Sequence, residues 1–250
     1  MAANSATSWA TSFLGIIRDY LYRTVSLLWV APVVAGLVVI PEFVQHVAEI
    51  SLGMFDSRAA AKLVADHPLR MGIGAFKIAG LVATFFASAR FWWCSVHGGR
   101  WYDPRGIAWA RLLVGSILFF VIGSAAEIYP LMLDRDPPVA VTVIAVLLSL
   151  PFLFVALAGL FGAKDIAFAV LVKRSWPYLL LLVLLLPLGF ASLSLLHQYN
   201  HKWAMGAVAP VTWALMIFDS LVVGLMASSV GAAFYTAFAR FHERLASEAA

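Results

Sequence analysis

Long apolar stretches alternate with short polar connections along this chain. About six stretches of roughly 20 to 28 mainly apolar residues are separated by segments that carry nearly all of the charge, and about 20 such residues in a helix cross a bilayer. The stretches lie at residues 24–47, 71–93, 107–133, 139–163, 177–196 and 207–238. The pattern predicts an all-α, polytopic membrane protein with about six transmembrane helices.

Two shorter segments have the spacing of amphipathic helices that lie in the membrane interface. Within residues 8–23, apolar side chains recur at helical intervals opposite Arg18 and its neighbours, and residues 164–176 repeat this character before the fifth stretch. We therefore expect residues 1–23 to form an amphipathic lead. Residues 1–250 are expected to form a single six-helix transmembrane domain.

The composition agrees with this fold and excludes several others. Hydrophobic residues make up 63% of the chain, charged residues only 12%, and the mean hydropathy is +0.92, which leaves too little polar surface for a soluble domain of 250 residues. The isoelectric point near 9.4 does not indicate nucleic acid, because the cations are scattered at the ends of the apolar stretches. Cys94 is the only cysteine, so no intrachain disulfide is possible.

The cations predict the orientation. If the N-terminus lies inside, eleven Lys and Arg residues fall on the cytoplasmic side and five on the outer side. The cytoplasmic set is Arg18, Arg23, Arg90, Arg100, Arg105, Arg111, Lys164, Lys173, Arg174, Arg240 and Arg244, and the outer set is Arg58, Lys62, Arg70, Arg135 and Lys202. Both termini of this multi-pass protein are therefore expected in the cytoplasm.

Four short segments resemble a known group of proteins. They are Arg90 to Trp93, Phe154 to Ala158, Ala167 to Trp176 and Ala232 to Tyr235. In these segments and in layout, the chain resembles bacterial polytopic membrane proteins akin to YciC and the membrane domain of glycerophosphodiester phosphodiesterases. The resemblance implies a six-helix fold in a bacterial inner membrane. It says little about activity, because the phosphodiesterase chemistry of the latter lies in a separate soluble domain.

Among the ionisable residues of the apolar stretches, where an unpaired charge costs at least about 2.5 kcal/mol, three stand out. They are Lys77, Glu127 and Asp219. Lys77 and Glu127 each lie about 9 Å below the outer boundary, from a rise of about 1.5 Å per residue, so they are expected to form an ion pair. The partner surfaces would be two polar faces, one with Arg70, Lys77, Thr84 and Ser88, the other with Ser116, Gly123, Ser124 and Glu127.

Asp219 lies near the expected midplane of the last stretch, where its side chain cannot reach the interface. It must be protonated, paired or next to water. A functional interpretation is a site that handles protons or a substrate. The alternative is a neutral acid or a structural pair that ties helices together, and we favour this alternative on the sequence alone.

Histidines give the weak candidates for a metal site. His197 and His201 are spaced i, i+4, but no acidic residue or cysteine accompanies them and they fall in an outer connection, which favours a polar cap over a metal. The other histidines lie at or beyond the ends of the stretches, so a haem within the bilayer has no ligands. No phosphate loop, serine-hydrolase or zinc-protease motif occurs. We expect no cofactor and no enzymatic activity.

A stripe of small residues follows the last stretch. It comprises Ser220, Gly224, Ala227, Ser228 and Gly231. Small residues let a second helix approach closely. We expect packing within the chain, with contact to other membrane proteins as the alternative.

These features lead to one functional expectation and one alternative. The first is a non-enzymatic membrane-integral or accessory component whose partner is the lipid bilayer. The alternative is a small transporter or lipid-handling protein that uses a polar cavity around Lys77, Glu127 and Asp219. A transporter should show a water-accessible path from one side to those charges.

Overall fold

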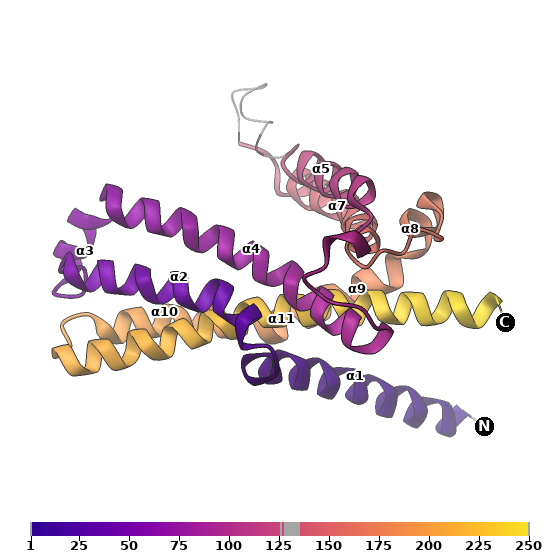
Figure 1. The fold of residues 1–250 in the computed structure, drawn as a ribbon, viewed down its shortest axis with the longest axis horizontal. Coiled ribbons are helices and arrows are strands. Elements are labelled where there is room, and N and C mark those ends of the chain that lie inside the picture. The colour runs from indigo at the N-terminus through magenta and orange to yellow at the C-terminus, as the bar shows by residue number, and fades with distance from the viewer. Residues whose placement is uncertain (1, 126, 128–135, 250) are drawn as a thin grey trace. The chain divides into compact units, whose positions relative to one another are not determined.

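The computed structural model describes residues 2–125, 127 and 136–249, without the side chains of residues 2–12 and 249. Within these ranges the chain is helical and contains no strand (Figure 1). The helical segments are α1 (Ala2–Val30), α2 (Pro32–Ser51), α3 (Arg58–Val64), α4 (Pro68–His97), the 3₁₀ turn η1 (Pro104–Gly106), α5 (Trp109–Gly123), α7 (Val139–Leu160), α8 (Phe168–Arg174), α9 (Trp176–Leu186), the π turn η2 (Pro187–Ala191), α10 (Ser192–Ala204) and α11 (Ala209–Ala249).

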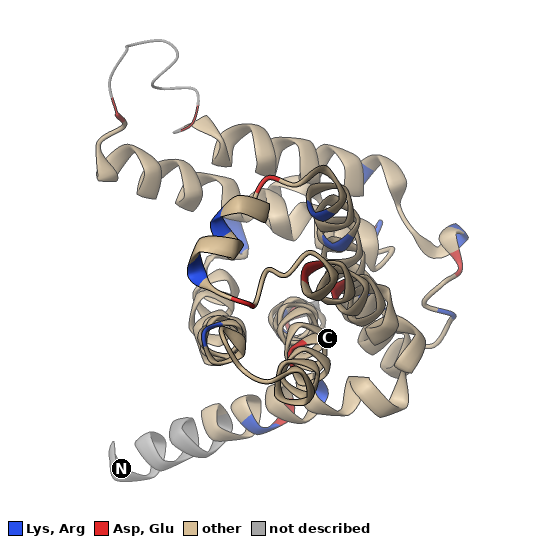
Figure 2. Cartoon of the chain, turned by 90° about the vertical axis from the view of Figure 1, so that its left-hand side faces the viewer, with Lys and Arg blue, Asp and Glu red and all other residues tan. Residues whose placement is uncertain are grey.

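The fold is that of an all-α membrane protein, as the sequence predicts. Five helical segments of the described chain are long and apolar enough to cross a bilayer: Pro32–Ser51, Pro68–His97, Val139–Leu160, Trp176–Ala204 and Ala209–Glu248. Large apolar side chains are exposed along them, and Figure 2 shows how few charged positions interrupt the helices. Such a surface suits lipid and not water.

The first predicted span is two helices. Residues 24–47 were expected to form one span, but α1 continues to Val30, the chain bends at Ala31, and Pro32 opens α2. Proline fits the first turn of a helix because the backbone N–H it lacks has no intrahelical partner there. Pro41 lies inside the continuous α2, which extends to Ser51.

Two other boundaries also differ from the sequence expectation. Residues 197–205 were expected to connect spans, but the helix from Trp176 continues through a π turn at Pro187 into α10 and ends at Ala204. The third stretch, 107–133, contains α5, which has 15 residues, and its C-terminal part lies largely outside the described residues.

The chain forms two compact units. Unit 1 contains residues 1–92 and 184–233, and unit 2 contains residues 93–183 and 234–250, so α4, α9 and α11 contribute to both. The single transmembrane domain expected from the sequence stays a prediction.

Small residues bring the helices of unit 1 close together. Gly224 of α11 faces Val39 of α2, and Gly231 faces Ser88 of α4, at distances that leave no room for a Cβ atom. Ser228 Oγ donates a hydrogen bond of 2.7 Å to the Thr24 carbonyl of α1. The small-residue stripe therefore packs inside the chain, as expected. Its members are buried there, and contact with other membrane proteins through this face stays a prediction.

A hydrogen bond joins two connections at one end of unit 1. Gly206, between α10 and α11, has a φ of 71°, a conformation that glycine adopts without strain. Its N–H donates to the carbonyl of Phe55, which follows α2, over 2.7 Å. Phe55 packs on Ala204 and Met216 beneath this turn. The contact holds the end of α10 beside the end of α2.

Unit 2 packs through glycines and aromatic rings. Gly115 of α5 and Gly159 of α7 each approach the backbone of the other helix too closely for a side chain. Phe154 and Phe161 of α7 contact Phe238 of α11, with ring centroids 5.9 and 4.9 Å apart. Trp93 stacks on Phe161 at 4.8 Å.

Candidate metal centre

One face of α2 is polar although it is buried. Glu42, Gln45, His46 and Glu49 are spaced i, i+3, i+4 and i+7, which places their side chains on the same side of the helix. Glu42 and His46 are 0% exposed and Glu49 is 1% exposed. A buried charge is tolerated only with partners, so this face requires them from neighbouring helices.

Asp219 of α11 supplies one partner. Its Oδ2 lies 3.1 Å from His46 Nε2, 2.7 Å from His197 Nδ1 and 3.4 Å from His201 Nε2. Its Oδ1 accepts a hydrogen bond of 2.8 Å from Asn200 Nδ2. Asp219 is therefore paired, one of the three states that the sequence allowed, and three imidazoles surround one of its oxygens.

The α10 residues reach this carboxylate because they share a helix face. The spacing i, i+3 and i+4 places His197, Asn200 and His201 on the same side of α10. The His201 ring lies 4.7 Å from the His197 ring and 5.2 Å from the His46 ring, measured between centroids. Imidazoles from two helices are thereby gathered at one point.

Two cations of α4 complete the surroundings of the α2 carboxylates. Arg70 Nε donates a 3.0 Å hydrogen bond to Glu49 Oε1, and Lys77 Nζ lies 3.2 Å from Glu42 Oε2. Arg70 and Lys77 are both 24% exposed, whereas the carboxylates they contact are buried. The cations thus close one side of a buried acidic face.

We call this group the polar cluster. It comprises Glu42, Gln45, His46, Glu49, Arg70, Lys77, His197, Asn200, His201 and Asp219, all in unit 1. Three carboxylates face two permanent cations, so one negative charge is uncompensated while the imidazoles are neutral. The cluster therefore needs one more positive charge, from a proton on an imidazole or from a bound cation.

Four residues of the polar cluster can hold a metal ion. Glu42, His46, His201 and Asp219 each offer one ligand atom, and these atoms all lie within 4.8 Å of one another. They come from α2, α10 and α11, so the site exists only in the folded unit.

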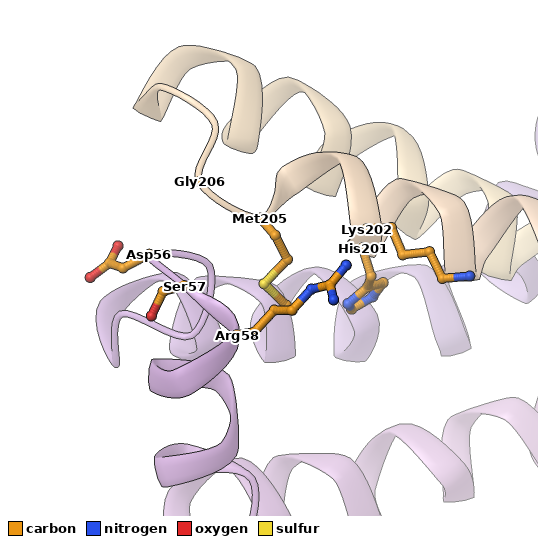
Figure 3. Close-up of a pocket in the computed structure, with 7 residues that line it drawn as sticks. All are labelled: Asp56, Ser57, Arg58, His201, Lys202, Met205 and Gly206. Carbon is orange, nitrogen blue, oxygen red and sulfur yellow. The ribbon is translucent and has the colours of Figure 1, made fainter.

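A pocket opens beside His201. It has a volume of about 610 Å³. It is lined by Asp56, Ser57, Arg58, His201, Lys202, Met205 and Gly206. Figure 3 shows Arg58 and His201 extending toward the same space from α3 and α10, while Asp56 points away. One residue of the candidate metal centre therefore lines a surface pocket, and its Nε2 atom lies buried behind it.

The predicted polar face of α4 is found in part, but its partner is α2 and not the stretch 107–133. Arg70 and Lys77 contact α2 carboxylates, Thr84 Oγ1 donates to the Val34 carbonyl at 3.5 Å, and Ser88 faces Gly231. The ion pair of Lys77 is with Glu42, where the sequence indicated Glu127. Glu127 is exposed and belongs to unit 2.

The interpretation of the histidines needs correction. His197 and His201 were expected in an outer connection without acidic neighbours, but they lie on α10 beside Asp219. His46 was placed at a span end, whereas it is fully buried inside α2. The signal that sequence reasoning missed is the spacing of Glu42, His46 and Glu49, a polar helix face that becomes visible once α2 is extended to Ser51.

Comparison with protein-family models, with curated proteins and with solved structures finds no match to this chain.

Proposed function

We propose that this chain is a small, non-enzymatic membrane carrier that takes up a cation at the polar cluster. The observation that carries the proposal is the convergence of ligand atoms from Glu42, His46, His201 and Asp219 beside a pocket that reaches His201. Ionisable groups buried in a transmembrane bundle are costly and typically mark ion pathways. The uncompensated negative charge of the cluster favours a positive cargo.

The access route supports this function. The buried carboxylates are 0 to 1% exposed, whereas His197 and His201 are 24% and 22% exposed. A cation that enters the pocket meets His201 first and Asp219 next. We expect a one-sided path of this kind in a carrier and none in a dry structural pair.

The excess of cations in the expected cytoplasmic segments orients the carrier. With both termini in the cytoplasm, the ends of α2 and α10 beside the pocket face the outside of a bacterial inner membrane. Uptake from the outer side into the cluster is the direction that follows.

A structural role is the second candidate. Side chains of α4 and α10 contact carboxylates on α2 and α11, so the polar cluster ties four helices of unit 1 together. In this case the cluster would stabilise the fold and move nothing.

Proteoliposomes separate the two candidates. The purified protein is reconstituted around a pH indicator and a fluorescent metal indicator, and influx is measured for protons and divalent metals. The test variant is Asp219→Asn, which keeps the shape of the side chain and removes its charge. The matched control is Glu243→Gln, an exposed acid further along α11 that pairs with Arg240.

We expect influx of one cation in the parent and in Glu243→Gln, and its loss in Asp219→Asn with a circular-dichroism melting curve that shows a folded protein. Absence of any influx in the folded parent, or equal influx in Asp219→Asn, would overturn the carrier and leave the structural role.

A further inference from the structure

We infer that the cation of the polar cluster is a divalent transition metal such as Zn²⁺, bound by Glu42, His46, His201 and Asp219. The inference rests on the proposed function in that it names the class of cation taken up at the same site.

The ligand types select the metal. Two imidazole nitrogens and two carboxylate oxygens suit Zn²⁺, Fe²⁺ or Mn²⁺, whereas Mg²⁺ and Ca²⁺ prefer oxygen alone. No thiolate belongs to this ligand set, which disfavours Cu⁺. The donor set therefore fits a borderline divalent ion.

The spacing of the ligand atoms fits four-coordinate geometry. With metal–ligand bonds of about 2.0 to 2.1 Å, the ligand atoms of a tetrahedral site lie about 3.3 Å apart. His46 Nε2 lies 3.3 Å from Glu42 Oε1 and 3.1 Å from Asp219 Oδ2. His201 Nε2 lies 3.4 Å from the same Asp219 oxygen. Three of the distances between ligand atoms are thus already close to those of a tetrahedral site.

Hydrogen bonds orient the central ligand. His46 Nδ1 lies 3.2 Å from Glu49 Oε2, so a carboxylate can accept the Nδ1–H and leave the Nε2 lone pair for a metal. Glu49 is itself held by Gln45, whose Nε2 donates over 2.9 Å, and by Arg70. This arrangement of carboxylate, histidine and ligand position is typical of zinc sites.

Buried polar atoms of the cluster give an independent indication. His201 Nε2 makes no hydrogen bond and lies 3.4 Å from Asp219 Oδ2, and the nearby buried acceptors Gln45 Oε1 and Asn200 Oδ1 make no hydrogen bond either. Glu42 Oε2 has only the ion-pair contact with Lys77 Nζ, at 3.2 Å. A divalent ion among the four ligands would pair the lone pairs that converge there and supply the missing positive charge.

Metal binding to the detergent-purified protein tests the inference. The protein carries an affinity tag without histidine, and Zn²⁺, Mn²⁺ and Mg²⁺ are titrated by equilibrium dialysis. Co²⁺ serves as a spectroscopic probe, because its visible bands are intense in tetrahedral sites and weak in octahedral ones. The test variants are His201→Gln, whose side chain is partly exposed and which should therefore fold, and Glu42→Gln. The control is His67→Gln, an exposed histidine of the α3–α4 connection.

We expect one Zn²⁺ per chain, Mg²⁺ binding weaker by several orders of magnitude, and intense Co²⁺ bands. His201→Gln should weaken Zn²⁺ binding by more than about 100-fold, beyond the range of changes outside the ligand set, and His67→Gln should leave it unchanged. No Zn²⁺ binding by the folded parent, or equal binding by parent and His201→Gln, would overturn the inference. Binding without influx would overturn only the carrier, and proton influx without metal binding would overturn only the metal.

Discussion

Lys77 of α4 and Glu42 of α2 form an ion pair across the contact between these helices, with 3.2 Å between Nζ and Oε2. Glu42 is buried whereas Lys77 is 24% exposed. Lys77 Nζ also donates a hydrogen bond of 3.5 Å to Glu42 Oε1, the oxygen that lies 3.3 Å from His46 Nε2. The lysine therefore contacts both oxygens of this buried carboxylate beside the imidazole.

A double-mutant cycle measures this pair. Without metal, Lys77→Met should destabilise the protein by up to about 3 kcal/mol, because it leaves a buried carboxylate unpaired. Lys77→Met combined with Glu42→Gln should recover part of that loss, with a coupling energy of about 1 to 3 kcal/mol. The free energy of unfolding in mixed micelles with a chelator gives these values.

The exposed pair Arg240–Glu243 on α11 is the reference cycle, and its coupling should stay below about 1 kcal/mol. If the two cycles give equal coupling energies, the Lys77–Glu42 contact is not a buried pair.

The sequence analysis singles out Lys77 but not its partner Glu42, for a physical reason. Lys77 and Asp219 are recognisable because they interrupt long apolar stretches. Glu42 and His46 lie close to the end of the predicted stretch 24–47. The helix that carries them begins later, at Pro32, and ends later, at Ser51. A span that begins at Pro32 and ends at Ser51 has both residues in its interior. Helix boundaries, and not residue chemistry, limited the prediction.

The long-range part of the site could not be predicted. The i, i+4 spacing of His197 and His201 is visible, but their acidic neighbour Asp219 comes from a different helix. Which helices meet depends on close approaches such as Gly224 to Val39 and on the turn at Gly206. A single sequence shows that these glycines are present and not which helix each of them faces.

The residue behind the ligand His46 should tune metal affinity without abolishing binding. Glu49→Gln keeps a hydrogen-bond acceptor for Nδ1–H but removes the charge that makes the imidazole a stronger ligand. Zn²⁺ affinity should fall by about 10 to 100-fold, a smaller loss than for His201→Gln. Competition dialysis with a chelator of known affinity checks this order, and a larger loss for Glu49→Gln would assign Glu49 to the ligand set.

Close packing of α4 on α2 should depend on one glycine. A Cβ at Gly80 would collide with the Leu37 carbonyl, whereas Gly72 of the same helix has no neighbouring atom within 4 Å. Gly80→Ala should destabilise unit 1 by about 1 to 3 kcal/mol. Gly72→Ala should be neutral or slightly stabilising. Thermal unfolding of both variants decides the matter, and equal melting temperatures would contradict the close approach.

The orientation can be tested with reporter fusions. The excess of cations in the expected cytoplasmic segments predicts that a reporter after Ala250 is active only in the cytoplasm. A reporter inserted near Ala60, in α3, should be active only on the outer side. The reverse activity at either position would remove the proposed uptake from outside.

Arg58 should slow the access of metal to the cluster. The Ser57 side chain accepts a hydrogen bond from the Ala60 N–H and so caps α3, placing Arg58 at the positive end of that helix, where the helix dipole does not favour a cation. Arg58 and Lys202 both line the pocket beside His201, and their charge repels an approaching divalent ion.

Arg58→Gln should therefore raise the association rate of Zn²⁺ by about tenfold at low salt, and high salt should shrink the difference because it screens exposed charges. Lys62→Gln is the matched control, since it removes a cation from the same helix that does not line the pocket. Stopped-flow measurement of Co²⁺ binding gives both rates. An Arg58→Gln rate no faster than that of Lys62→Gln would show that the metal reaches His201 by a route other than this pocket.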